Sequence, residues 1–189
     1  MRPTRDEAWQ LLCRYTETEA LRRHALQVEA AMRHFATLFD EDPEAWGLVG
    51  LCHDLDYEQF PEQHCVMTKK ILTQEGWEEE DIRAIMAHGW GMVTDVEPRT
   101  PREKALYTVD ELTGIINAAC LVRPSHSVHD LTVKSLRKKF KDARFAAGCN
   151  REVITRGAQM LGMELDTVMV ETIKGLQARA QLCGLQGDC

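Results

Sequence analysis

The sequence predicts an all-α protein folded as a single domain. Apolar residues recur at the three- to four-residue spacing of an amphipathic helix through nearly every patterned stretch, and no run alternates apolar and polar positions as a half-buried strand does. A chain of 189 residues fits one domain of ordinary size. Because no repeat, low-complexity tract or Pro/Gly-rich linker divides it, we expect one helical bundle over residues 1–189.

Nine helices account for these patterns. They are expected over 4–16, 18–39, 43–55, 61–75, 78–88, 101–122, 132–147, 150–161 and 164–183. Proline favours the first turn of a helix, and prolines stand near three of the expected starts, at Pro43, Pro61 and Pro101. Glycine favours the position after the last turn, and glycines follow four of the expected ends, at Gly76, Gly89, Gly148 and Gly162.

The chain is acidic, since 23 lysines and arginines against 30 aspartates and glutamates leave a formal net charge of −7. Nucleic-acid backbones and anionic membranes attract positive surfaces, so this balance argues against non-specific binding to either. No apolar run approaches the roughly 20 residues of a membrane span, and the first residues lack the apolar core of a secretory signal. Seven scattered cysteines without a C-x-x-C pair are typical of reduced thiols. We therefore expect a soluble cytoplasmic protein.

Two of the expected helices carry ionisable residues on or beside apolar faces. In helix 18–39, His24 lies at the edge of the apolar stripe. Helix 43–55 is apolar almost all round, which is typical of a buried central helix, yet its last turn carries His53 and Asp54. A buried carboxylate is costly unless it is paired or bound to a metal. We therefore expect a positively charged partner beside Asp54.

The same mixture recurs in later helices. Asp110 is a second carboxylate on a core face, in helix 101–122. His64 shares the apolar stripe of helix 61–75, and His88 ends the helix that follows. These positions add two imidazoles and one carboxylate to the inward-facing polar residues.

Together the inward polar residues predict a metal site. Its six members come from five helices: His24, His53, Asp54, His64, His88 and Asp110. Helical bundles commonly project His and carboxylate ligands into their cores, and four imidazoles with two carboxylates suit divalent Fe, Mn, Co, Ni or Zn. Six ligands exceed what one open catalytic ion needs, so we expect two ions bridged by Asp54, with His53 and Asp54 as the catalytic residues.

Each of these histidines, taken alone, is also explained as a hydrogen-bonded core residue. A second His-Asp pair, His129-Asp130, lies in an expected polar loop, and we assign it to chance together with His34 and His126. The two carboxylates on core faces are harder to explain without a cation. The metal site is therefore the preferred interpretation.

The order of these six residues resembles the HD-domain superfamily of metal-dependent phosphohydrolases. Four strings resemble its HDIG-type branch: residues 21–29 (LRRHALQVE), 50–58 (GLCHDLDYE), 110–114 (DELTG) and 121–125 (LVRPS). The resemblance covers about residues 20–165 and implies an HD-type helical core there, with further helices packed on it at both ends. It also implies that His24, His53, Asp54 and Asp110 hold one ion and that His64 and His88 complete a second. The chain departs from the family motif by carrying Asp56 in place of glycine, and we favour a solvated helix end for Asp56 over contact with the site.

The function implied by this resemblance is a metal-dependent phosphohydrolase that uses a mono- or dinuclear His/Asp site to activate water against a phosphoester. Its substrate would be a small phosphorylated or anionic molecule. The alternative is an HD-type di-iron oxygenase acting on a small phosphonate or polyol, because such relatives use a similar His/Asp set. A third hypothesis is a non-catalytic sensor or scaffold with the HD fold.

A basic cluster at 134–144 offers candidate contacts to a substrate. Four of its cations share one face of the expected helix, Lys134, Arg137, Lys138 and Lys141, and the first three are the candidates. Arg123, just before Pro124, is a fourth candidate. Either these side chains bind a substrate phosphate or they form an ordinary solvated face.

Loop 89–100 starts directly after His88 and contains two glycines. It is expected either to be a lid that carries Trp90 over the site or to be an ordinary surface loop.

Overall fold

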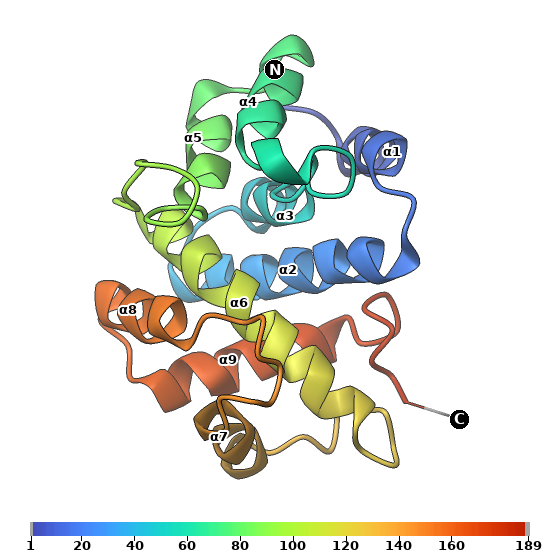
Figure 1. Cartoon of the computed structure of the whole chain (residues 1–189), viewed down its shortest axis with the longest axis vertical. Helices are drawn as coiled ribbons and strands as arrows, with labels where there is room; N and C mark the ends of the chain where they lie inside the picture. The colour runs from blue at the N-terminus through green and yellow to red at the C-terminus, as the bar shows by residue number, and fades with distance from the viewer. Residues whose placement is uncertain (1, 188–189) are drawn as a thin grey trace.

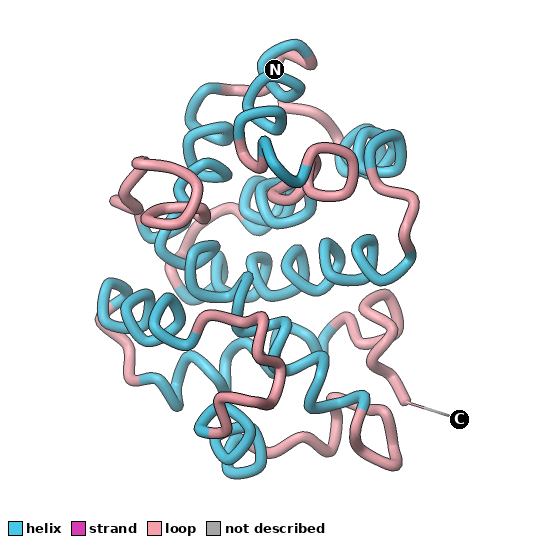
Figure 2. The backbone as a smooth tube through the Cα atoms, in the orientation of Figure 1, coloured by secondary structure: helices cyan, strands magenta, loops and turns pink. Residues whose placement is uncertain are grey.

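The structure is a computed structural model that describes residues 2–187. Over this range it contains nine α-helices, one short 3₁₀ helix and no β-strand (Figure 2), which confirms the predicted all-α class. The elements are α1 (Arg5–Tyr15), α2 (Glu19–Leu38), α3 (Pro43–Leu51), η1 (Pro61–Gln63), α4 (Val66–Gln74), α5 (Glu79–Ala87), α6 (Pro101–Leu121), α7 (Val133–Lys141), α8 (Arg151–Leu161) and α9 (Leu165–Ala178). Among these described helices, none is both long and apolar enough to cross a membrane.

The two longest helices, α2 and α6, organise the bundle. Figure 1 shows α2 across the middle of the molecule, with α1, α3, α4 and α5 on one side of it and α7, α8 and α9 on the other. Helix α2 packs against α3, α6 and α9, and α6 packs against α5 and α8. Residues placed on α2 and α6 therefore lie at the centre of the fold.

Local signals in the sequence account for most helix starts. Thr4 and Thr100 each form a capping box, in which the threonine side chain accepts from the backbone N–H of a glutamate three residues later and that glutamate accepts from the threonine N–H. Pro43 and Pro101 occupy the first turns of α3 and α6, as the sequence predicts. Asn150 caps α8 with its side-chain oxygen.

Gly50 lets α3 approach α2 closely. A Cβ atom built on Gly50 would lie 3.0 Å from the backbone carbonyl oxygen of Val28 and 3.0 Å from Cγ of Met32, which is tighter than ordinary packing. The short contact places the end of α3 beside the polar edge of α2. The rings of His53 and His24 consequently lie with their centroids 5.2 Å apart.

The helix predicted over 43–55 ends earlier, at Leu51, so His53 and Asp54 lie in a turn rather than in its last helical turn. The backbone carbonyl of Gly50 accepts a hydrogen bond from Nδ1 of His53 at 2.8 Å. In a continued helix that carbonyl would serve the N–H of Asp54. The side chain of His53 thus helps to end the helix that carries it.

The helix predicted over 61–75 is also divided, so His64 does not share a helical stripe with the apolar residues that follow. The 3₁₀ helix η1 is followed by a turn at His64 and Cys65, and α4 begins only at Val66. Cys65 has φ of 68°, in the left-handed region that a right-handed helix cannot contain. The direction of the His64 side chain is therefore set by this turn and not by the axis of α4.

Two later helices are shorter than predicted. Helix α7 ends at Lys141 instead of 147, and α9 ends at Ala178 instead of 183. The guanidinium group of Arg151 explains the first difference, because it binds carbonyl oxygens of the segment 140–149. Its acceptors are the backbone oxygens of Phe140, Asp142, Phe145, Ala146 and Cys149. Carbonyls held in this way are directed to one side chain rather than along a helix axis.

Candidate metal centre

The structure brings all six predicted ligands to one place. His24 lies on α2 and Asp110 on α6, whereas the other four come from the ends of elements: His53 and Asp54 after α3, His64 before α4, and His88 at the C-terminal cap of α5. His53 and His88 are buried, and the other four are half-buried. All except the fully buried His53 line one cavity. Four polar side chains are therefore placed by turns and caps, not by helical faces.

Asp54 lies between two pairs of imidazoles. Its Oδ2 atom is 3.4 Å from Nε2 of His53 and 3.8 Å from Nε2 of His24. Its Oδ1 atom is 3.5 Å from Nε2 of His64 and 3.5 Å from Nε2 of His88. One carboxylate oxygen thus faces each pair, which is the arrangement expected of a ligand shared by two ions.

Asp110 completes the first of these groups. Its Oδ1 atom lies 2.9 Å from Nε2 of His24 and 3.2 Å from Nε2 of His53. The ligand atoms of His24, His53, Asp54 and Asp110 all lie within 4.8 Å of one another, close enough to hold one ion. Two imidazole nitrogens and two carboxylate oxygens form a donor set suited to divalent transition metals.

Three of the four imidazoles are oriented by a hydrogen bond at the ring nitrogen that faces away from Asp54. Nδ1 of His53 donates to the carbonyl of Gly50 at 2.8 Å, and Nδ1 of His88 donates to the carbonyl of Ile85 at 2.5 Å. Nδ1 of His64 lies 2.8 Å from the carboxylate of Asp56. With the proton held at Nδ1, the lone pair of Nε2 points into the cluster, as in the imidazoles that bind metals in proteins.

The prediction that Asp56 lies at a solvated helix end is wrong. This side chain is buried with no exposed surface. Besides the bond to His64, its Oδ2 atom accepts a hydrogen bond from the backbone N–H of Thr68 at 2.7 Å. The backbone N–H of Asp56 in turn donates to the hydroxyl oxygen of Thr68 at 3.1 Å, which closes a small ring of polar contacts. Asp56 therefore supports the site by orienting the ring of His64. The two side chains can meet only because the chain turns back on itself before α4.

The charges in the cluster stabilise one another. Burial lowers the pKa of His53, but Asp54 and Asp110 outweigh it and raise that pKa well above its ordinary value. Burial raises the pKa of Asp54 and of Asp110, but the neighbouring imidazoles, His53 foremost, hold both well below the ordinary range. Both carboxylates are therefore ionised at neutral pH and require positive charge beside them.

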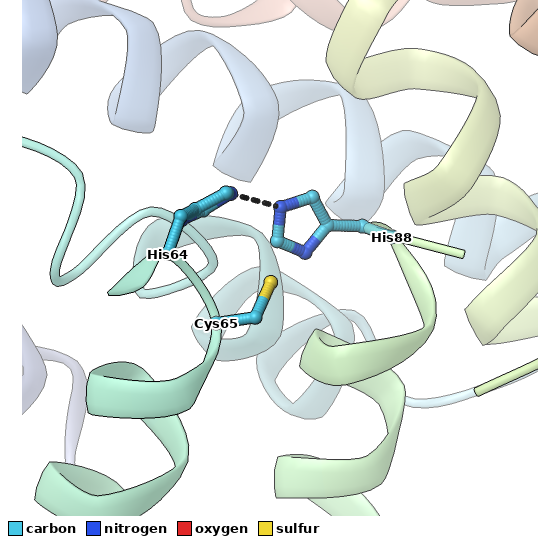
Figure 3. A group of neighbouring side chains, drawn as sticks. All are labelled: His64, Cys65 and His88. Carbon is cyan, nitrogen blue, oxygen red and sulfur yellow. Dashed lines mark hydrogen bonds between the residues drawn. The ribbon is translucent and has the colours of Figure 1, made fainter. Parts of the chain in front are cut away.

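Cys65 lies against the second pair of imidazoles and was not among the predicted ligands. Ligand atoms of His64, Cys65 and His88 lie within 4.8 Å of one another. Nε2 of His64 and Nε2 of His88 are 3.2 Å apart, and Figure 3 shows the sulfur of Cys65 below that contact, beside the ring of His88. Burial, with Asp56 and Asp54, raises the pKa of the Cys65 thiol. The oxygen of Asp54 is therefore the better placed third ligand for this pair.

A cavity of about 350 Å³ opens onto the cluster. Its other walls are made by helix α2, the turn after Asp54, the loop after His88, helix α6 and the segment before α8. The residues are Leu21, Tyr57, Gly89, Met92, Val93, Glu111, Gly114, Gly148 and Cys149. Loop 89–100 thus contributes to the site, but Trp90 does not cover it. The Trp90 ring packs on Tyr107 with centroids 5.8 Å apart, and the guanidinium of Arg156 lies over it.

The structure places none of the four predicted substrate-binding cations in this cavity. Lys134, Arg137 and Lys138 lie on α7, which packs on α6 and α9, and Arg137 pairs with Asp166. Arg123 donates to Asp130, a member of the second His-Asp pair. The basic cluster and the His/Asp cluster are therefore separate features of the molecule.

Three residues at the site escaped sequence analysis: Tyr57, Cys65 and Glu111. Cys65 and Tyr57 lie in turns whose direction no helical pattern describes. Glu111 follows a predicted ligand directly, and its position on α6 was the one available signal. Burial, with Asp110, raises the pKa of Glu111.

Comparison of the chain with family models, with curated proteins and with solved structures finds no match.

Proposed function

We propose that this chain is a metal-dependent phosphohydrolase with a dinuclear His/Asp centre of the HD type. One observation carries the proposal: the two oxygens of Asp54 face two different pairs of imidazole Nε2 atoms at 3.4 to 3.8 Å. His24, His53 and Asp110 would hold one ion with Asp54, and His64 and His88 would hold the second. Divalent ions in such a site supply a Lewis acid for phosphoryl oxygens and lower the pKa of water towards about 7.

The protein residues supply orientation and charge balance. The Nδ1 contacts of His53, His64 and His88 keep three Nε2 atoms directed at Asp54. The two aspartates neutralise two of the four positive charges that two divalent ions bring, so the centre retains positive charge for a phosphate group. The cavity gives a small substrate access to the half-buried face of the cluster.

The proposal is tested with protein purified without chelator. We expect elemental analysis to find close to two divalent ions per chain, and we expect Mn²⁺-loaded protein to release phosphate from phenyl phosphate. Asp54→Asn should lose the metal and the activity together. The matched control is Asp130→Asn, which alters the second His-Asp pair in an exposed loop and should retain both.

Two results would contradict the proposal. Phosphate release that persists in metal-free Asp54→Asn protein would show that the cluster is not the catalytic centre. Substrate-dependent oxygen consumption by iron-loaded protein, without phosphate release by any metal form, would favour the oxygenase chemistry instead.

A further inference from the structure

The mouth of the metal cavity is apolar. Tyr57, Met92 and Val93 line it, and each keeps between 45% and 49% of its surface exposed, so none of them is buried in the core. They come from two separate turns, one following Asp54 and one following His88. Large apolar side chains left exposed together around a pocket are typical of a ligand-binding site.

The cavity offers an anion neither a lysine nor an arginine side chain. No lysine or arginine in residues 2–187 is among its lining residues, whereas Asp54, Asp110 and Glu111 are. Arg23 lines an adjoining pocket with His24, but its guanidinium pairs with Glu19. The lysines and arginine of α7 do not line the cavity. Positive charge for a substrate would therefore come from the metal centre alone, which suits one phosphate group and leaves a polyphosphate chain without partners.

We propose that the substrate is a phosphate monoester of an apolar alcohol or phenol, with its hydrocarbon part against Tyr57, Met92 and Val93. This inference rests on the proposed function and narrows it. In the reaction, a bond forms between phosphorus and the oxygen of water, the bond between phosphorus and the ester oxygen breaks, and the alcohol leaves with one proton of the water. The products are inorganic phosphate and the free alcohol, which is apolar enough to leave through the same mouth.

Binding of phosphonates tests the inference without turnover, because their C–P bond is not an ester. Calorimetric titration of Mn²⁺-loaded protein compares phenylphosphonate with methylphosphonate. We expect phenylphosphonate to bind about tenfold more tightly, since burying roughly 60 Å² of apolar surface at about 25 cal/mol per Å² corresponds to that factor. Met92→Ser should remove most of the difference. Leu38→Ser is the matched control, because Leu38 is equally exposed but lies at the end of α2 away from the cavity.

Other results would contradict either the inference alone or the proposed function as well. If both phosphonates bind equally, or if phenyl phosphate is hydrolysed less efficiently than ATP, the inference fails while the proposed function stands. If Met92→Ser and Leu38→Ser have the same effect, the apolar mouth is not the binding surface and the inference fails. If neither phosphonate binds protein shown to hold its metal, the proposed function itself fails and the inference with it.

Discussion

The buried carboxylate of Asp56 holds Nδ1 of His64 at 2.8 Å while Nε2 of the same ring faces Oδ1 of Asp54 at 3.5 Å. One imidazole thus links a fully buried acid to an acid at the cavity. The first acid sets the orientation and the tautomer of the ring, and the second shares the cation that the ring would bind. Substitutions at the two acids should therefore have different effects.

Asp56→Asn should weaken metal binding without abolishing it. The amide still fills the space, but the Nδ1–H of His64 no longer donates to a negatively charged carboxylate. Losses of about 10- to 100-fold in metal affinity are typical of such changes. Competition titration with a metal-sensitive dye measures the affinity. Glu62→Gln, on the exposed η1, is the control and should bind as the unaltered protein does. Equal affinity for Asp56→Asn would show that the contact does not support the centre.

In the metal-free protein, the contact between Asp56 and His64 should contribute most to the free energy of unfolding between about pH 4 and pH 6.5. Burial raises the pKa of Asp56, but hydrogen bonds from His64 and Thr68 outweigh it and lower that pKa below its ordinary 3.8. Burial lowers the pKa of His64, but Asp56 and Asp54 outweigh it and raise that pKa above its ordinary 6.5. The contribution of Asp56 is present above pH 3.8 and is lost as the pH falls through its folded pKa, whereas that of His64 is present below pH 6.5 and is lost as the pH rises through its folded pKa.

This pH dependence is measured by denaturant unfolding of chelator-treated protein. In Asp56→Asn the decline on the acid side should flatten, because that variant has no carboxyl to protonate at this position. An unchanged profile would assign the acid sensitivity to other carboxylates.

Cys65→Ser should keep both ions of the proposed centre. The thiol lies beside His88, but Oδ1 of Asp54 is placed at equal distances from the two Nε2 atoms of the pair. The buried hydroxyl should lower the free energy of unfolding by roughly 1–3 kcal/mol. Elemental analysis measures the ions, and the absorption spectrum of Co²⁺-loaded protein reports the ligand type. A thiolate-to-cobalt band that disappears in the variant would make Cys65 a ligand and contradict the assignment.

Arg151→Ala should loosen one wall of the cavity. The Arg151 guanidinium binds carbonyls of the segment that carries Gly148 and Cys149 to the site. We expect faster amide hydrogen exchange across 142–149 and a loss of roughly 0.5–1.5 kcal/mol in the free energy of unfolding, because partly buried carbonyl oxygens lose their hydrogen-bond donor. Arg144→Ala is the control, since its side chain is 95% exposed. Protection that is unchanged in Arg151→Ala would mean that other contacts hold the segment.

The sequence by itself determined the all-α class and the six polar residues that the structure brings together. Helical periodicity is a local property, because neighbours three and four positions apart share one face whatever lies around them. Asp54 and Asp110 were recognisable because a carboxylate among apolar neighbours is costly in any fold, so its presence there needs an explanation before its partners are known.

Only the tertiary structure decided what surrounds those six residues. Asp56 is buried because the chain turns back before α4, and α7, which packs on α6 and α9, contributes no side chain to the cavity. Trp90 packs on Tyr107, which leaves Met92 and Val93 at the mouth. These outcomes depend on the directions of turns and on contacts between segments far apart in the chain, and helical spacing carries no information about either.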